Sequence, residues 1–363
     1  MHKGFHAQNQ EGYIMKYFVL ISLMLMMICL VPSMCISSNQ PDNPQIANPN
    51  LINQFKGRIA GVSFSPNDKV LVTSGMDGTI RIWGMENWKE LKILRTGEAS
   101  FCVTFTPDGK NLATSVYGKG IILWSVKQWK KIGLFTGPHS VMAGAFITFS
   151  PDGKKIASGW GKRVIIWNTF THKQLHVIRG FKNDVVPVVF SPNGRLLATG
   201  DYNGTIRIWR VSDWRCVRRF TDIDEIVESL AFSPNSKLMA YGDGRGTVRV
   251  WKISSWRCIK RFTDVGGVVE SLTFSPNGNF MAAGYHNGAI RIWNTLNWKL
   301  VHIATGHKRA VLRMAFSYDG KRLASASNDG TVRIWNTKNW NTLRVIIPIA
   351  GRSYPPDDLR QNQ

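Results

Sequence analysis

The chain has 363 residues, enough for one large β domain or two average domains, and hydrophobic residues make up 44% of it. That apolar content excludes a chain that is disordered over most of its length. Lys and Arg number 46 against 23 Asp and Glu, so the net charge of +23 favours anionic partners and says little about the fold. The five cysteines include no CxxC pair, which indicates neither a disulfide framework nor a metal site.

The N-terminal segment predicts export. Residues Tyr17–Val31 form a largely apolar run directly after Lys16, the pattern of a secretory signal peptide, and Met15 is a candidate for the true start. We assign residues 1–36 to this signal and the polar residues 37–50 to a linker. Two alternatives stay open: a retained membrane anchor, because the run approaches the ~20 residues of a spanning helix, and a lipid-attached Cys35. The expected location is secreted or extracytoplasmic, in the periplasm or cell envelope, or anchored to a membrane.

The remainder of the chain repeats one unit seven times. A tryptophan after an aliphatic residue recurs every 41 to 43 residues, at Trp83, Trp124, Trp167, Trp209, Trp251, Trp293 and Trp335. A phenylalanine before a tight turn keeps the same spacing, at Phe64, Phe105, Phe149, Phe190, Phe232, Phe274 and Phe316. Each copy holds four strand-like runs, which in the fourth copy are Val185–Phe190, Arg195–Thr199, Thr205–Trp209 and Cys216–Phe220. Such a unit buries its faces only by stacking against its neighbours.

These markers resemble those of the WD-repeat β-propeller family over Leu51–Pro348. The resemblance implies an all-β fold, a seven-bladed propeller of four-stranded antiparallel blades over residues 51–348, followed by a flexible tail at 349–363. The residue after each tryptophan departs from the family's usual Asp. The family's hydrogen-bonded structural network is complete only in the last copy, as His307, Ser325, Asp329 and Trp335. We therefore expect Asp329 to contribute more stability than Asp77.

Closure of the ring is left open by the sequence. Residues 51–57 (LINQFKG) and 342–348 (TLRVIIP) both have the character of an outer strand, so one closes the ring and the other is available to extend an edge.

The sequence predicts no enzyme, no catalytic or metal-binding residue and no cofactor. His172 and His176 have the spacing of helical metal ligands, but in a strand-like run they lie ~13 Å apart. No nucleophile elbow, phosphate loop or HExxH motif occurs. A propeller enzyme remains a distant alternative because a fold alone never excludes chemistry.

The leading functional prediction is a non-catalytic scaffold that binds a protein or peptide. The resemblance implies partner binding on the face that bears the loops before each inner strand and the second hairpins. Mapped onto this sequence, that face includes Lys182, Asp184, Tyr202, Asp224, Glu225, Glu228, Glu270, His286, Lys308 and Arg309. Its carboxylates in the fifth and sixth copies would suit a basic peptide, and ordinary loop polarity is the competing interpretation.

A basic rim on the outermost strands gives the second prediction. Its principal members are Arg215, Arg218, Arg219, Arg257, Lys260 and Arg261. Charge on an edge strand prevents aggregation, and it also attracts polyanions such as lipid head groups or acidic glycans; nucleic acid is not expected if the protein is exported. A further set of aromatic residues lies five positions after the first tryptophans and is predicted to fill the gap between blades: Trp88, Trp129, His172, Trp214, Trp256, Trp298 and Trp340.

Overall fold

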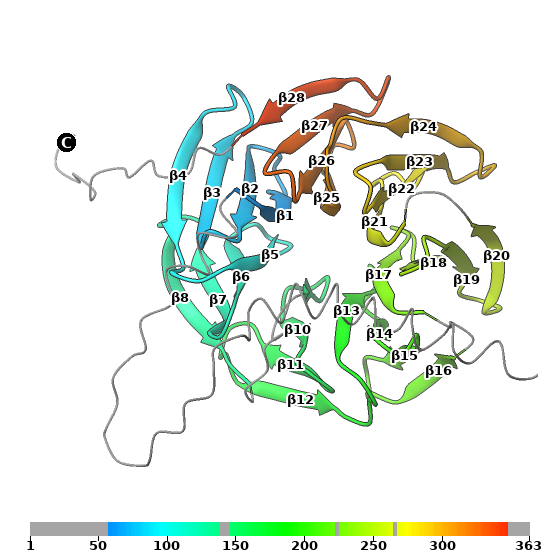
Figure 1. Cartoon of the computed structure of the whole chain (residues 1–363). Helices are drawn as coiled ribbons and strands as arrows, with labels where there is room; N and C mark the ends of the chain where they lie inside the picture. The colour runs from blue at the N-terminus through cyan, green and yellow to red at the C-terminus, as the bar shows by residue number, and fades with distance from the viewer. Residues whose placement is uncertain (1–56, 138–145, 222–224, 264–266, 348–363) are drawn as a thin grey trace, which may run out of the picture. The chain divides into compact units, whose positions relative to one another are not determined.

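The computed structural model describes residues 57–137, 146–221, 225–263 and 267–347 (Figure 1). The predicted signal or anchor (1–36), linker (37–50) and tail (349–363), together with Asp224, lie outside these residues. Within them, no helix is long and apolar enough to cross a membrane.

The described residues form seven separate four-stranded sheets, each made of consecutive antiparallel strands, arranged as the blades of a propeller (Figure 1). The predicted all-β, seven-bladed fold is therefore confirmed. In every blade the first strand is innermost and the fourth is outermost. Blade 1 holds β1 (Ile59–Phe64), β2 (Val70–Gly75), β3 (Thr79–Gly84) and β4 (Glu90–Arg95). Blade 2 holds β5 (Ser100–Phe105), β6 (Asn111–Val116), β7 (Gly120–Ser125) and β8 (Lys130–Phe135). Blade 3 holds β9 (Ile147–Phe149), β10 (Lys155–Gly159), β11 (Val164–Asn168) and β12 (Gln174–Ile178).

The remaining blades repeat this order. Blade 4 holds β13 (Val185–Phe190), β14 (Leu196–Asp201), β15 (Ile206–Arg210) and β16 (Cys216–Phe220). Blade 5 holds β17 (Val227–Phe232), β18 (Leu238–Asp243), β19 (Val248–Lys252) and β20 (Arg257–Phe262). Blade 6 holds β21 (Val269–Phe274), β22 (Phe280–Tyr285), β23 (Ile290–Asn294) and β24 (Leu300–Ala304). Blade 7 holds β25 (Val311–Phe316), β26 (Arg322–Ser327), β27 (Val332–Asn336) and β28 (Thr342–Ile346).

The turn after each inner strand is built by its own side chains. In blade 4, the Ser191 hydroxyl donates to the Asn193 amide oxygen (2.7 Å) and accepts the backbone N–H of Leu196 (2.9 Å). Gly194 completes the turn at a φ of 70°, which glycine adopts without steric cost. The Ser-Pro-Asn-Gly sequence therefore closes a tight hairpin, and its repetition fixes where every second strand begins.

The second set of aromatic residues occupies the turn before each outer strand, where the backbone is left-handed. Their φ angles lie between 52° and 61°, a region that bulky residues rarely adopt, and the residues are Trp88, Trp129, His172, Trp214, Trp256, Trp298 and Trp340. Trp214 stacks on His176 of the preceding blade, with ring centroids 5.4 Å apart. The predicted position between blades agrees with this contact and with the packing of Trp88 against residues of blades 7 and 1.

Blade 7 obtains its outer strand from the C-terminal part of the chain. β28 pairs with β27, so Thr342–Ile346 fills that position, whereas Leu51–Lys56 lie outside the described residues. Blades 7 and 1 then meet through side chains. Asp68 accepts the backbone N–H groups of Tyr318 (2.9 Å) and Asp319 (2.8 Å), and buried apolar residues of both blades form one core cluster.

Candidate functional site

Five of the predicted partner-binding residues come together on the loop face of three neighbouring blades. Asp184 precedes β13, and Tyr202 lies in the β14–β15 turn of the same blade. Glu228 is on β17, Glu270 is on β21, and His286 lies in the β22–β23 turn. We call these five residues the blade 4–6 cluster. Burial raises the pKa of the Tyr202 hydroxyl most, and the charges of Asp184, Glu228 and Glu270 raise it further, so these three carboxyl groups lie within electrostatic range of Tyr202.

One ion pair lies within the blade 4–6 cluster. His286 Nδ1 is 2.8 Å from Glu270 Oε1, and this hydrogen bond raises the pKa of the imidazole above its usual value. Glu228 has no hydrogen bond or ion pair within the described residues. Burial raises the pKa of its carboxyl group to about 8, and the neighbouring charge of Glu270 acts in the same direction.

The other predicted partner-binding residues are not part of this cluster. Glu225 forms an ion pair with Arg245 at 2.5 Å. Lys182, Lys308 and Arg309 are exposed, and Lys308 and Arg309 lie before the inner strand of blade 7. The predicted face therefore carries carboxylates on blades 4 to 6, with Lys182 exposed beside Asp184, and two further exposed cations on blade 7.

Arg313 is a residue of this region that the sequence analysis missed. Its guanidinium lies 3.7 Å from the centroid of the Phe146 ring, and its Nη1 donates to the backbone oxygen of Leu312 (2.7 Å). Its side chain also hydrogen-bonds to the buried Cys102 thiol, and burial raises the pKa of that thiol.

A signal for Arg313 was present in the sequence. The equivalent positions of five other inner strands carry small residues or proline, namely Gly61, Cys102, Pro187, Ser229 and Ser271, whereas blade 3 carries Phe146 there. Because a charged side chain on an inner strand is costly to bury without a compensating contact, the single arginine in that series predicts a partner inside the ring.

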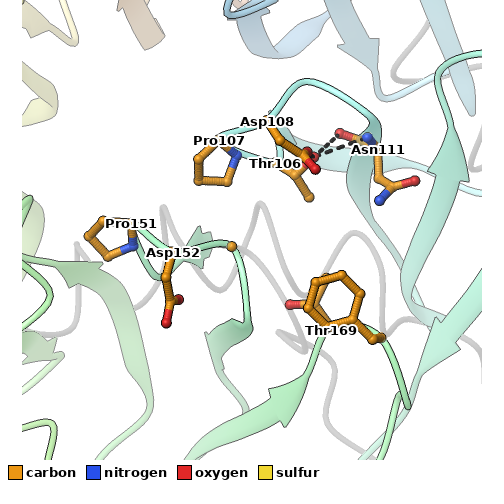
Figure 2. Close-up of a pocket in the computed structure, with 9 residues that line it drawn as sticks. Thr106, Pro107, Asp108, Asn111, Pro151, Asp152 and Thr169 are labelled. Atoms are coloured by element: carbon orange, nitrogen blue, oxygen red, sulfur yellow. Dashed lines mark hydrogen bonds between the residues drawn. The ribbon is translucent and has the colours of Figure 1, made fainter.

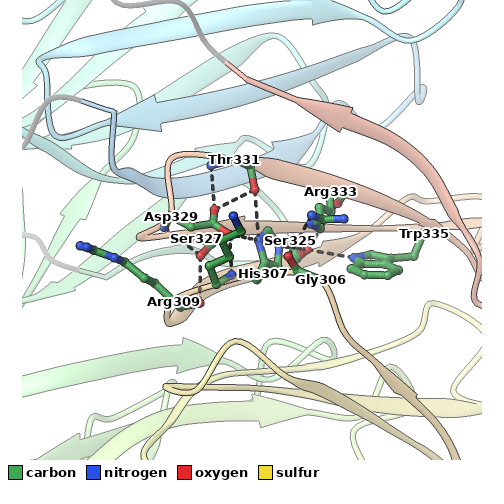
Figure 3. Close-up of polar contacts among 10 residues, drawn as sticks. Gly306, His307, Arg309, Ser325, Ser327, Asp329, Thr331, Arg333 and Trp335 are labelled. Carbon is green, nitrogen blue, oxygen red and sulfur yellow. Dashed lines mark hydrogen bonds and ion pairs between the residues drawn. The ribbon is translucent and has the colours of Figure 1, made fainter.

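The structural network of blade 7 joins the loop before β25 to the β26–β27 turn (Figure 3). His307 Nδ1 lies 3.0 Å from Asp329 Oδ2, and His307 Nε2 lies 2.8 Å from the Ser325 hydroxyl. The Trp335 indole donates to the same hydroxyl (2.9 Å). Asp329 also accepts from Thr331 and from the backbone N–H of Lys308. Although burial opposes it, these hydrogen bonds hold the pKa of Asp329 far below its usual value.

The basic rim is exposed. Its side chains lie on or directly before β16 and β20, the outer strands of two neighbouring blades: Arg215, Arg218, Arg219, Arg257, Lys260 and Arg261. These strands also expose two cysteines, Cys216 and Cys258, whereas Cys102 is buried, and all three are free thiols. The rim therefore presents positive charge on the outer edge of blades 4 and 5, whose loop face carries carboxylates of the blade 4–6 cluster.

A pocket of about 280 Å³ lies between blades 2 and 3, on the face opposite the blade 4–6 cluster (Figure 2). Its acidic groups already have partners. The hydroxyl of Thr106 and the backbone N–H of Lys110 donate to Asp108. The hydroxyl of Ser150 and the backbone N–H of Lys154 donate to Asp152 in the same way. Partial burial raises the pKa of each carboxyl group, but these hydrogen bonds outweigh it and the pKa is lowered. These carboxylates stabilise their own turns.

The two histidines with metal-ligand spacing have separate structural contacts. His172 packs edge-on against Phe135, with ring centroids 5.2 Å apart, while His176 stacks on Trp214. In the part of the chain that the structure describes, no group of three or more His, Cys, Asp and Glu residues could hold a metal ion.

The comparisons with known proteins agree with this architecture. The model "WD domain, G-beta repeat" matches residues 49–84, 129–168, 172–210 and 298–336, and "Anaphase-promoting complex subunit 4 WD40 domain" matches residues 230–308. The chain belongs to the WD-repeat β-propeller family.

Similar curated proteins share only part of their length with this chain. Transcription initiation factor TFIID subunit 5 of Caenorhabditis elegans is 26% identical over 162 residues, which are 44% of this chain and 25% of that protein. WD repeat and HMG-box DNA-binding protein 1 of Xenopus laevis is 27% identical over 165 residues, 43% of this chain and 14% of that protein. Apoptotic protease-activating factor 1 of Rattus norvegicus is 27% identical over 165 residues, 44% of this chain and 12% of that protein. The match thus spans a quarter or less of each relative.

Proposed function

We propose that this propeller is a non-catalytic scaffold that binds a protein partner through the loop face of blades 4 to 6. One observation carries the proposal: three blades bring polar side chains to one place without using them for folding. The carboxyl groups of Asp184 and Glu228 and the hydroxyl of Tyr202 have no hydrogen bond or ion pair within the described residues. Buried or half-buried polar groups without partners are costly in a protein that works alone. A bound partner would satisfy them.

The comparisons support a role in an assembly at this general level. One similar protein is named as a subunit of a transcription initiation factor, and one matching family model is named for a subunit of a complex. A rigid ring with loops at one face presents a wide surface for such contacts.

A second candidate function is supported by the basic rim. Six exposed cationic side chains lie on or directly before β16 and β20, the outer strands of two neighbouring blades. Protection of an edge strand needs charged residues but does not need all of them to be positive. That arrangement would attract a polyanion through its charge density, with affinity falling steeply as salt rises.

Affinity capture with the intact protein from its natural host separates these two functions. The wild-type protein is expected to capture a partner. Tyr202→Ala should no longer capture it, whereas the matched rim variant Arg218→Gln/Arg219→Gln should still capture it. Tyr202→Ala removes a half-buried ring from the loop face, whereas the rim change removes two exposed charges. A partner lost only from the rim variant would support polyanion binding, and one unaffected by both changes would contradict the loop-face scaffold.

We also propose that the protein works outside the cytoplasm. The proposal is supported by the apolar run Tyr17–Val31 after Lys16, which has the form of a secretory signal. The intact mass of the protein from its host is expected to correspond to a chain that begins near residue 37. A mass that includes Tyr17–Val31 would favour a membrane anchor instead.

A further inference from the structure

The pocket between blades 2 and 3 contains a buried hydroxyl group that the fold does not use. Thr169 lines this pocket and is only 2% exposed, yet its hydroxyl has no hydrogen-bond partner within the described residues. A buried hydroxyl without a partner is costly, because it has lost its hydrogen bonds to water. A ligand in the pocket would restore such a bond.

The equivalent threonines of other blades show that Thr169 is an exception. Thr295 holds this position in blade 6, and its hydroxyl donates to the backbone oxygen of Gly278. Thr337 in blade 7 donates to the backbone oxygen of Gly320 in the same way, at 2.6 Å. The backbone N–H of Thr169 bonds to its neighbouring turn as theirs do, but its hydroxyl does not. Blade 3 therefore leaves free a group that two other blades use to hold a turn.

Two carboxylates from neighbouring blades line the same pocket. Asp108 lies in the β5–β6 turn of blade 2, Asp152 in the β9–β10 turn of blade 3, and Thr169 directly after β11 (Figure 2). Both carboxylates accept the hydrogen bonds of their own turns at Oδ1, whereas Oδ2 of each has no such bond among the described residues. The turns thus hold each carboxylate in place and leave one oxygen to accept a strong hydrogen bond from a ligand.

The charges around the pocket favour a neutral ligand. The positive charge of Lys110 acts on Asp108. Those of Lys154 and Lys155 act on Asp152. Three lysines therefore offset two carboxylates, so no excess negative charge selects a cation, while an anion would be repelled by the carboxylates that it meets directly. No set of side chains in the described ranges forms a metal site.

The pocket also offers apolar surfaces, which narrow the class of ligand. The Phe170 side chain is exposed, and the rings of Pro107 and Pro151 belong to the two carboxylate turns. No other blade has an aromatic residue at the position of Phe170, where the residues are Glu86, Lys127, Ser212, Ser254, Leu296 and Lys338. A hexopyranose has C–H groups on the faces of its ring and hydroxyls around its edge. It can therefore pack on an aromatic ring and donate to carboxylates at the same time.

We infer that the pocket between blades 2 and 3 binds one neutral hexopyranose ring. Asp108 and Asp152 accept hydrogen bonds from its hydroxyls, the Thr169 hydroxyl donates to one of its oxygens, and Phe170 packs against its face. The volume of about 280 Å³ lies at the small end of ligand sites, which span roughly 300–1,000 Å³, and agrees with a single sugar ring. The inference goes beyond the scaffold function and does not depend on it, because the loop face of blades 4 to 6 is not involved.

Ligand-observed NMR titration of the intact protein tests this inference with defined sugars. The neutral probes are the methyl glycosides of glucose, galactose, mannose and N-acetylglucosamine, and at least one is expected to bind with a Kd of about 1 mM. Methyl glucuronide should bind about tenfold more weakly than the best neutral probe, because its carboxylate meets Asp108 and Asp152. No binding of any neutral probe at about 20 mM would overturn the inference. Tighter binding of the cationic methyl glucosaminide than of every neutral probe would overturn it as well.

Thr169→Val assigns the binding to the unused hydroxyl. Valine already holds this position in blades 2 and 4, as Val126 and Val211, so the fold accommodates it. The substitution is expected to weaken the best neutral probe about fivefold and to leave the melting temperature unchanged, because the hydroxyl has no partner to lose. The matched control Thr295→Val removes the bond to Gly278 and should lower the melting temperature without changing the affinity. The same behaviour in Thr169→Val would show that its hydroxyl serves the fold and would contradict the site.

The double variant Asp108→Asn/Asp152→Asn tests the carboxylates without disturbing their turns. Asparagine occupies the equivalent position in three blades and accepts the same serine hydroxyl there, as Asn193, Asn235 and Asn277. Loss of both charged acceptors is expected to weaken the best neutral probe at least about tenfold. Asp319→Asn makes the same change in the turn of blade 7, outside the pocket, and should leave the affinity unchanged. An affinity unchanged in the double variant, or lowered equally by Asp319→Asn, would overturn the role of these carboxylates.

Discussion

Replacing Asp329 with alanine is expected to lower the free energy of unfolding by about 3 kcal/mol. The substitution removes the acceptor of four interactions, from His307, the backbone N–H of Lys308 and both donors of Thr331. The buried His307 ring would keep its contact with Ser325 but lose its charged partner. Removing one member of a satisfied network costs the desolvation of the groups left behind. Urea denaturation followed by tryptophan fluorescence measures the loss.

The matched control for this prediction is Asp77→Ala in blade 1. Asp77 accepts from the backbone N–H and hydroxyl of Thr79, and its nearest cation, Arg81, is 3.9 Å away. No histidine completes the set there, so the loss is expected to be about 1 kcal/mol. Equal losses for the two variants would show that the histidine adds nothing to the network.

The same network predicts a pH dependence of stability. Because the folded-state pKa of Asp329 is depressed, its contribution is fully present above its unfolded value of about 4. It is lost as the pH falls from there through the folded value. Wild-type protein should therefore lose more stability between pH 4 and pH 2 than Asp329→Asn does, as measured by urea denaturation at each pH. Parallel stability curves for the two proteins would contradict this account.

The blades could be predicted from sequence because every strand boundary is marked by a local signal that recurs. The turn Ser191–Gly194 uses a hydroxyl, a proline, an amide and a left-handed glycine, each at a position where local chemistry decides the conformation. The predicted run Cys216–Phe220 matches β16 at both ends, and the predicted run Thr205–Trp209 differs from β15 by one residue at each end. Local rules fix these elements, and stacking then follows from their apolar faces.

The gathering of the blade 4–6 cluster could also be predicted, but not its electrostatics. Equivalent positions on β17 and β21 place Glu228 and Glu270 on neighbouring inner strands whatever their identity. The raised pKa of Glu228 depends instead on how far it is removed from water and on the charges of Glu270, Arg313 and His286. Those quantities arise from side chains of several blades, which no repeat pattern encodes.

The contact between Arg313 and Phe146 was missed for a related reason. It joins blade 7 to the segment before β9, residues more than 160 positions apart in the sequence. The left-handed backbone at Trp88 and its equivalents was missed as well, because tryptophan has no intrinsic preference for that region. There the N–H of Trp88 donates to the carbonyl oxygen of Gly84, and this turn holds the conformation, while burial of the indole between blades offsets its cost.

Trp167→Ala is expected to lower the free energy of unfolding by about 3–5 kcal/mol, because each sheet is complete in itself and buried apolar side chains join neighbouring blades. Trp167 is 2% exposed and packs against Trp160 and Phe135, with ring centroids 5.6 Å and 5.9 Å away, in a cluster shared by blades 2 and 3. The control Phe170→Ala removes a ring that is 66% exposed and should cost at most about 0.5 kcal/mol. The cavity left by Trp167→Ala lies at the interface between blades 2 and 3. Amide hydrogen exchange should therefore accelerate most in these two blades. Uniform acceleration around the ring would instead show that the blades unfold as one unit.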